Sequence, residues 1–144
     1  MKRYLIIFLM IALITVIVPG CREYDNKLDI GYFFKTGPEK AVLDFLQSME
    51  NRDPGYIYSN LLQNKDKNKI SREKYVSEFN EILEDVKDIE IRRTVYLGYE
   101  GNLSKVVAEF RVTYQNGEQK EYKKYIYLVE ENNKWKIVFE KTFI

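Results

Sequence analysis

The stretch VVAEFRVTYQNGEQKEYKKYIYLVEENNKWKIV, residues 106–138, decides the fold of this chain. Apolar and polar side chains alternate along it with the period of two that a half-buried strand requires. Asn116-Gly117 and Asn132-Asn133 interrupt the alternation, and such pairs tolerate the positive φ of a tight hairpin turn. The stretch therefore predicts three antiparallel strands joined by two hairpins, with the last strand over residues 135–143.

The same pattern predicts how these strands pair, because a slip of one residue would turn apolar side chains to the wrong face. We expect a three-residue loop with a glycine bulge at Asn116-Gly117 and a two-residue loop at Asn132-Asn133. The predicted pairs are Val106 with Ile126, Phe110 with Tyr122, Leu128 with Ile137, Ile126 with Phe139, Tyr127 with Val138 and Tyr125 with Glu140.

Upstream of this stretch, residues 86–97 predict a first strand and residues 37–84 predict helices. Thr36 and Glu39 have capping-box spacing, and Ser71 is a second expected N-cap. The charged run at residues 65–69 is expected to be a solvated loop. The apolar positions are Ala41, Val42, Phe45, Leu46 and Met49 in the first helix, Tyr75, Val76, Phe79, Ile82 and Leu83 in the second, and Ile89, Ile91, Val95 and Leu97 in the strand.

These elements predict an α+β fold, in which N-terminal helices pack on a curved four-stranded antiparallel meander sheet. We expect Trp135 to be buried near Leu128 and Ile137. Aromatic residues on the inner faces could line a small-molecule pocket between sheet and helices, or they could simply fill the core. These pocket-lining candidates are Phe45, Tyr75, Phe79, Phe110 and Trp135.

Three segments resemble the nuclear transport factor 2-like (NTF2-like, cystatin-like) superfamily: PEKAVLDFL at 38–46, ISREKY at 70–75 with Phe79, and NKWKIV at 133–138. More narrowly, the chain resembles the extracytoplasmic members found in Gram-positive lipoproteins and at the N-terminus of some penicillin-binding proteins. The resemblance covers about residues 37–143 and implies a cone-shaped domain. Its motifs concern packing, so they support a fold and do not carry a function.

The N-terminus predicts a lipid anchor. Lys2 and Arg3 precede an uncharged apolar run over residues 5–18, which suits a signal peptide better than a bilayer span. Val18-Pro19-Gly20-Cys21 resembles a lipobox, which implies cleavage after residue 20 and lipidation of Cys21, although Pro19 departs from the usual pattern. The alternative is an uncleaved signal anchor. We expect residues 21–36 to form a tether whose aromatic cluster packs on the domain at residues 37–144.

Composition disfavours an enzyme. The chain has no histidine, and its only cysteine is the lipidation candidate, so the commonest general base and metal ligand are missing. Enzymes of the resembled superfamily use a pocket Asp or Glu, often with a His, and neither Asp44 nor Glu109 makes such a pair. We expect no cofactor and no metal. The formal net charge of only +1 does not indicate the strongly basic surface that binds nucleic acid.

A binding module of the cell envelope, held at the extracytoplasmic face of the membrane through Cys21, is therefore the leading hypothesis. The outer sheet face, with Val107 and Val129 among its residues, is unusually apolar, which is typical of an interface. The partner-surface candidates are Tyr125, Tyr127 and Val138, and the partner would be an envelope protein or a second copy. Alternatively, the aromatic residues at 32–34 cover this face. A small-molecule-binding pocket protein is the second hypothesis.

Overall fold

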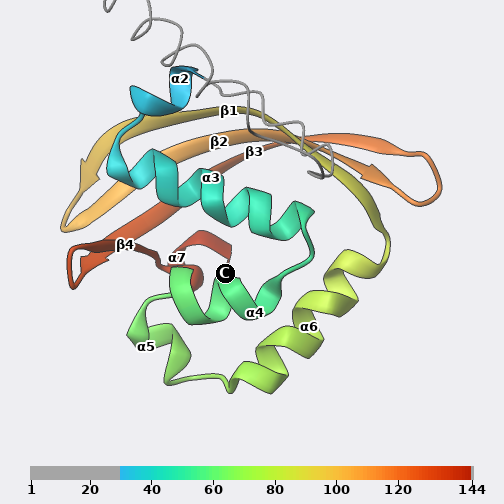
Figure 1. Cartoon of the computed structure of the whole chain (residues 1–144), viewed down its shortest axis with the longest axis horizontal. Helices are drawn as coiled ribbons and strands as arrows, with labels where there is room; N and C mark the ends of the chain where they lie inside the picture. The colour runs from blue at the N-terminus through green and yellow to red at the C-terminus, as the bar shows by residue number, and fades with distance from the viewer. Residues whose placement is uncertain (1–29, 144) are drawn as a thin grey trace, which may run out of the picture. The chain divides into compact units, whose positions relative to one another are not determined.

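Within residues 30–143, the four predicted strands form one antiparallel sheet in which strands adjacent in sequence are adjacent in space (Figure 1). They are β1 (Val86–Glu100), β2 (Leu103–Tyr114), β3 (Gln119–Glu131) and β4 (Lys134–Ile137). The computed structural model describes residues 30–143, so the predicted signal peptide and Cys21 lie outside the described residues. Residues Gly31–Ile144 make up one unit of the chain.

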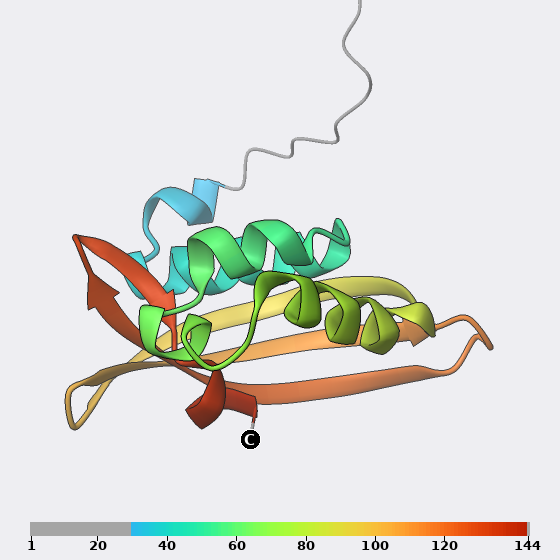
Figure 2. The same cartoon turned by 90° about the horizontal axis from the view of Figure 1, so that it is seen from below.

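Helices precede the sheet, as the α+β prediction requires, and Figure 2 shows α3 and α6 on the same side of it. Thr36 and Glu39 form the predicted capping box: the Thr36 N–H donates to the Glu39 carboxylate at 2.8 Å, and the Glu39 N–H donates to the Thr36 hydroxyl. Ser71 caps α6 by accepting from the Lys74 N–H. The helices are α2 (Ile30–Phe33), α3 (Gly37–Glu50), α4 (Pro54–Tyr56), a π-helical turn (Ile57–Leu61), α5 (Asn64–Lys67) and α6 (Arg72–Glu84).

The core lies between these helices and the inner face of the sheet. From α3, Val42, Phe45 and Leu46 are buried, as the helical period predicted. They belong to one cluster with alternate residues of β2 and β3, such as Val106 and Ile126. Full burial of an apolar side chain of this size stabilises the fold by about 1.5–3 kcal/mol, so this cluster provides the main stabilisation.

Both predicted hairpins are confirmed. The Tyr114 N–H donates to the Glu118 carbonyl, and the Gly117 N–H donates to the Tyr114 carbonyl, which leaves a three-residue loop with Gly117 at φ 85°. This is the bulged turn that pairs Val106 with Ile126 and Phe110 with Tyr122. Asn132 and Asn133 both have positive φ, and Leu128 pairs with Ile137.

The first strand is more irregular than its alternation predicted. Its pairing with β2 shifts between Ile91 and Arg93, and again between Tyr96 and Gly98. After the first shift Thr94 is buried in place of the expected Val95, and Leu97 is exposed. A bulge inserts one extra residue and so reverses the alternation beyond it, which is why the prediction for Leu97 was wrong.

The predicted last strand was also wrong beyond Ile137, where the chain turns into a short helix, α7 (Phe139–Phe143). The pairs of Ile126 with Phe139 and Tyr125 with Glu140 therefore do not form. Helical spacing instead brings two phenylalanine rings inward: the Phe143 ring centroid lies 5.7 Å from that of Phe45, and the Phe139 ring centroid lies 6.0 Å from that of Tyr75. These ring contacts favour the helix over a longer strand, although Phe139 is only partly buried and Phe143 remains 38% exposed.

Two of the three aromatic residues of the tether, Phe33 and Phe34, do not pack on the domain as predicted. Phe33 and Phe34 are 67% and 85% exposed. Tyr32 lies under the Lys40 ammonium, whose nitrogen is 5.2 Å from its ring centroid. Phe33 and Phe34 are therefore too exposed to cover the outer face of the sheet. Among the helices of residues 30–143, none combines the length and apolar character that a membrane crossing needs.

Candidate functional site

An apolar pocket of about 250 Å³ opens between α5, α6 and α7, and we call it the α6 pocket. Leu62, Tyr75 and Phe79 are buried and form part of its wall. Ile82, also part of the lining, is 65% exposed, so the pocket reaches the surface beside it. Its lining consists of Leu62, Asp66, Lys69, Ile70, Tyr75, Glu78, Phe79, Ile82, Phe139 and Glu140.

One acidic side chain joins the elements that form the pocket. Asp66 is only 5% exposed, although it lies in the charged run that was expected to be solvated, so that expectation was wrong for this residue. Its carboxylate accepts from the Gln63 side-chain amide at 2.9 Å and from the Phe139 N–H at 2.7 Å. These bonds tie α5 to the first residue of α7 and so position one wall of the pocket.

Tyr75 contributes a second unusual polar group to the wall. Its ring packs against those of Tyr58 and Phe79, each with a centroid separation of 5.5 Å. Its hydroxyl is buried without a hydrogen-bond partner in the part of the chain that the structure describes. Burial also raises the pKa of Tyr75 well above its ordinary value, so the hydroxyl stays protonated and able to donate.

The rim of the pocket is acidic. Glu78 and Glu140 lie at the rim with Lys69, whose ammonium is 2.5 Å from the Glu140 carboxylate. Lys69 lowers the pKa of Glu140 by this hydrogen bond, so Glu140 remains ionised. Together with Asp66 the lining has three carboxylates and one ammonium, and Lys74 lies 3.8 Å from Glu78 outside the lining. The remaining small acidic excess favours a ligand with positive charge around an apolar group.

The predicted pocket-lining residues fall into three places. Tyr75 and Phe79 line the α6 pocket, which lies between helices and not between the sheet and the helices where the pocket was expected. Phe45 and Phe110 are core residues, and the Phe110 ring stacks on Tyr122 with centroids 5.5 Å apart. Trp135 is only partly buried, so it lies at the edge of the core, where it lines an open groove beside α3.

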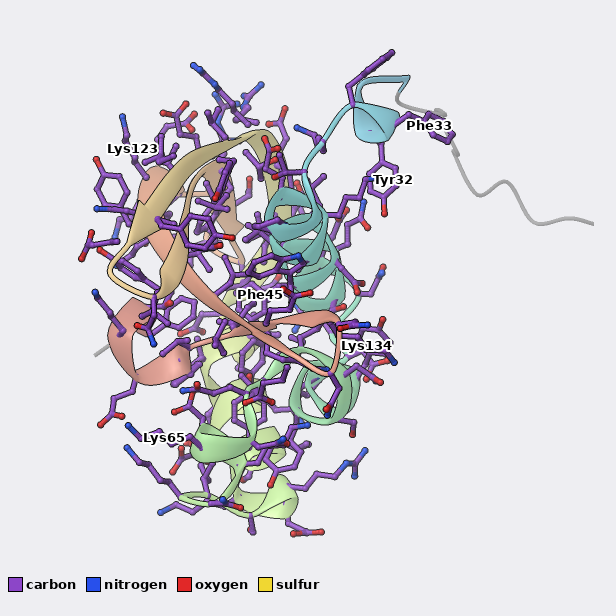
Figure 3. All side chains as sticks on the ribbon, turned by 90° about the vertical axis from the view of Figure 1, so that its left-hand side faces the viewer. Tyr32, Phe33, Phe45, Lys65, Lys123 and Lys134 are labelled. Atoms are coloured by element: carbon purple, nitrogen blue, oxygen red, sulfur yellow. The ribbon has the colours of Figure 1, made fainter. Side chains whose placement is uncertain are left out.

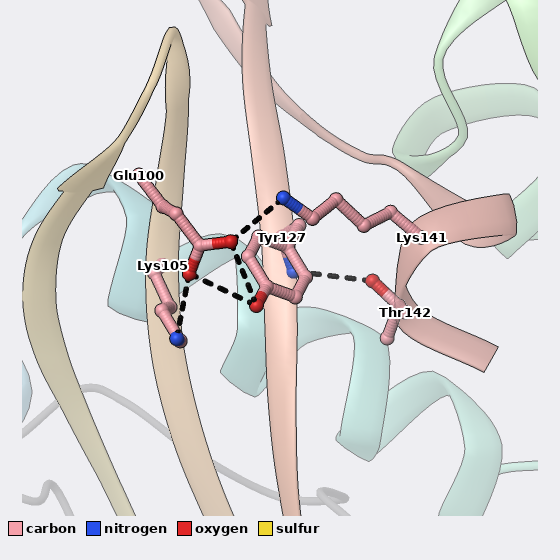
Figure 4. Close-up of polar contacts among 5 residues, drawn as sticks. All are labelled: Glu100, Lys105, Tyr127, Lys141 and Thr142. Atoms are coloured by element: carbon pink, nitrogen blue, oxygen red, sulfur yellow. Dashed lines mark hydrogen bonds and ion pairs between the residues drawn. The ribbon is translucent and has the colours of Figure 1, made fainter.

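The outer sheet face holds the predicted partner-surface residues, but it is less apolar than its sequence indicated. Tyr125 is 47% exposed, whereas Val107 and Val138 are buried. Tyr127 lies inside a charged cluster of Glu100, Lys105 and Lys141, which we call the Glu100 cluster (Figure 4). The Lys141 nitrogen is 4.2 Å from the Tyr127 ring centroid, and its ammonium bonds Glu100 at 2.9 Å.

Many of the charged side chains on this face form ion pairs with one another. Hydrogen bonds from Lys105 and Lys141 lower the pKa of Glu100 to about 2. Farther along the sheet, Glu90, Arg111 and Glu121 are direct cross-strand partners, and Arg111 bonds Glu121 at 2.6 Å and approaches Glu90 at 3.6 Å. The face is therefore a ladder of ion pairs in which Tyr125 is the exposed aromatic residue of the three candidates.

The sequence missed part of the α6 pocket. Ile70 and Ile82 were assigned to packing, and Phe139 to a strand, because none carries a chemical signature of its own. A better signal was the position of Ile82 in the helix that Ser71 caps. Ile82 lies one residue before Leu83, beside the buried stripe of Tyr75, Phe79 and Leu83, so its apolar side chain is left exposed. Within residues 30–143, no group of three or more acidic side chains is arranged to hold a metal ion, and Cys21 lies outside this range.

Comparison with known proteins identifies the fold and the family. No curated protein matches the chain in sequence. The solution structure of RPA3114, a SEC-C motif containing protein from Rhodopseudomonas palustris, superposes with a TM-score of 0.52 at 11% identity, over 70% of this chain and 74% of that one. At this identity the likeness concerns the fold alone. The family model for the NTF2-like N-terminal transpeptidase domain matches residues 37–144, so the chain belongs to that family of NTF2-like domains.

Proposed function

We propose that this chain is a binding module of the cell envelope, lipid-anchored through Cys21, that docks a partner protein in the α6 pocket. The observation that carries the proposal is an apolar pocket with a charged rim and an exposed isoleucine at its mouth. The family description names an N-terminal domain of transpeptidases, which is an accessory position beside a catalytic domain, and this supports a non-catalytic role.

The size of the pocket favours a protein partner over a free small molecule. Pockets for drug-sized ligands measure about 300–1,000 Å³, and the α6 pocket, at about 250 Å³, is smaller. It suits one large apolar side chain, the kind of anchor that dominates interface energy. The acidic side chains of Asp66, Glu78 and Glu140 favour positively charged residues on either side of that apolar side chain. The partner is therefore a segment that presents an apolar residue flanked by Lys or Arg, such as an amphipathic helix.

The Tyr125 face remains a second candidate surface, because Tyr125 is exposed and Lys105 lies over its ring at 4.8 Å. Ion pairs occupy most of that face, so an interface there would be small and salt-sensitive. A second copy of the chain or an envelope protein could bind it.

Crosslinking in membranes tests both surfaces. A photo-crosslinking residue is placed at Ile82, at Tyr125, or at Tyr99 as an exposed aromatic control on the β1–β2 hairpin. We expect a specific product from position 82, and the same partner from a crosslinking residue placed at Glu78 instead. Ile82→Glu should abolish the product from position 78, whereas Tyr99→Glu should not. Both substitutions are on the surface, so each should change the free energy of unfolding by less than about 0.5 kcal/mol. A product from position 125 alone would move the interface to the sheet face and contradict the proposal.

A further inference from the structure

A second concave site lies on another part of the domain and has different chemistry. It is an open groove of about 520 Å³ between α2, α3, the π-helical turn and β4, and we call it the Trp135 groove. Figure 3 shows Tyr32 and Lys134 on one side of the molecule, with Lys65 and Lys123 on the other. The lining is Tyr32, Gly37, Lys40, Ala41, Asp44, Gln47, Tyr56, Asn60, Leu61, Lys134, Trp135 and Lys136.

The groove is positively charged. It is lined by three lysines, Lys40, Lys134 and Lys136, and one acid, Asp44. None of these lysines forms a salt bridge with a carboxylate among residues 30–143. The Lys136 ammonium donates to the Asn60 carbonyl. Burial, followed by the nearby charges of Lys67 and Lys134, lowers the pKa of Lys136. An anion in the groove would relieve this uncompensated charge.

Aromatic rings and neutral hydrogen-bonding groups accompany the lysines. The Trp135 indole lies against Gly37 so closely that a Cβ atom there would be 2.5 Å from the ring nitrogen, and that nitrogen has no hydrogen-bond partner in the described chain. Asp44 accepts from the Tyr56 hydroxyl at 3.0 Å, and Gln47 and Asn60 place amides in the lining. Flat rings next to amides and a carboxylate are suited to the C–H faces and hydroxyls of sugar rings.

From these observations we infer that the Trp135 groove binds an anionic glycan, with sugar rings against Trp135 and Tyr32 and acidic substituents on Lys40 and Lys134. Asp44 within the groove can accept hydrogen bonds from sugar hydroxyls, which favours a glycan over an anion that lacks hydroxyl groups. The inference concerns a different surface from the α6 pocket, so either can fail without the other.

Trp135 is the only tryptophan in the chain, so its fluorescence reports directly on the groove. The full chain in neutral detergent would be titrated with polygalacturonate, a carboxylated glycan. Dextran serves as the neutral glycan, polyglutamate as the anion without sugar, and oligothymidylate as the nucleic acid. We expect polygalacturonate alone to change the emission in a saturable manner.

The lysine variants separate specific binding from general charge attraction. Each of Lys40→Gln and Lys134→Gln should weaken polygalacturonate binding about tenfold, which corresponds to about 1.4 kcal/mol, because each removes one charge-assisted hydrogen bond. Lys65→Gln removes the same charge from a distant, exposed site and should change nothing. Absence of a response to polygalacturonate, an equal response to polyglutamate or oligothymidylate, or an equal loss in Lys65→Gln would each overturn the inference. Circular dichroism of every variant confirms that the fold is intact.

Discussion

At the scale of single residues, Tyr75 shows how the α6 pocket departs from an ordinary core. Its ring fills space between Tyr58, Phe79 and Phe139, as a phenylalanine ring would. Its hydroxyl has no partner among the described residues, and a buried polar group left without a hydrogen bond costs about 1–3 kcal/mol. The hydroxyl therefore contributes nothing to folding in the free domain, which leaves a role in binding open to it.

Tyr75→Phe tests this directly. We expect the variant to be more stable than the wild type by about 1 kcal/mol, because it removes the unpaired hydroxyl and keeps the ring. Urea unfolding followed by circular dichroism measures the difference. If the hydroxyl also donates to the partner, crosslinking from position 82 falls in this more stable variant. Lower stability of Tyr75→Phe would show that the hydroxyl has a partner and would contradict the argument.

At the scale of elements, the hairpins could be predicted and the last helix could not. Gly117, Asn132 and Asn133 adopt the positive φ that their residue types favour, and the register follows from the apolar face. Residues 139–143 read FEKTF, in which the phenylalanines suit a strand as well as a helix. In the helix, Phe143 contacts the Phe45 ring of α3 and Phe139 contacts the Tyr75 ring of α6. These contacts join residues far apart in sequence, so no local sequence pattern predicts them.

The candidate site was harder to predict than the fold for the same reason. Tyr75 and Phe79 could be found because they recur on the buried side of α6. Asp66 was hidden in a charged run, and only its contact with the Phe139 N–H, 73 positions away, explains its burial. The shifts in β1 likewise depend on how β2 and the helices are placed. A single sequence gives the periodicity of each element but not the contacts between elements that form a pocket.

The prediction at this scale concerns Asp66, because its carboxylate links α5 to the first residue of α7. Asp66→Ala should destabilise the domain by about 2–3 kcal/mol, because it leaves the Phe139 N–H and the Gln63 amide without an acceptor in a buried site. Asp66→Asn keeps one oxygen acceptor and should lose less. Urea unfolding of both variants measures this, and an equal effect of the two would contradict the argument, because it would mean that the lost negative charge matters and the retained oxygen acceptor does not. Asp53→Ala is the matched control, because Asp53 caps α4 on the surface and its loss typically costs about 1 kcal/mol.

At the scale of the whole molecule, the domain offers chemically distinct surfaces: an acidic-rimmed apolar pocket, a basic aromatic groove and a face of ion pairs. Their proposed roles require that the domain be held near the membrane. Fifteen residues, 22–36, separate Cys21 from the domain at residues 37–144, and such a segment spans at most about 55 Å when fully extended. Partners of a lipidated chain would then be confined to the layer next to the bilayer, where a high local concentration compensates for a small interface.

Lipidation at Cys21 is therefore the prediction on which this arrangement depends. A single acyl chain holds a protein only reversibly, whereas two chains, at about 0.8 kcal/mol per buried methylene, anchor it firmly. In cells fed a labelled fatty acid, the wild type should carry label and remain in the membrane fraction. Cys21→Ala should lose the label and appear as an uncleaved precursor or a released protein. Pro19→Ala, a neighbouring change that leaves the thiol in place, should keep the label and controls for disturbance of the leader. Equal labelling of the wild type and Cys21→Ala would show that Cys21 is not the attachment site, and retention without label would favour a signal anchor.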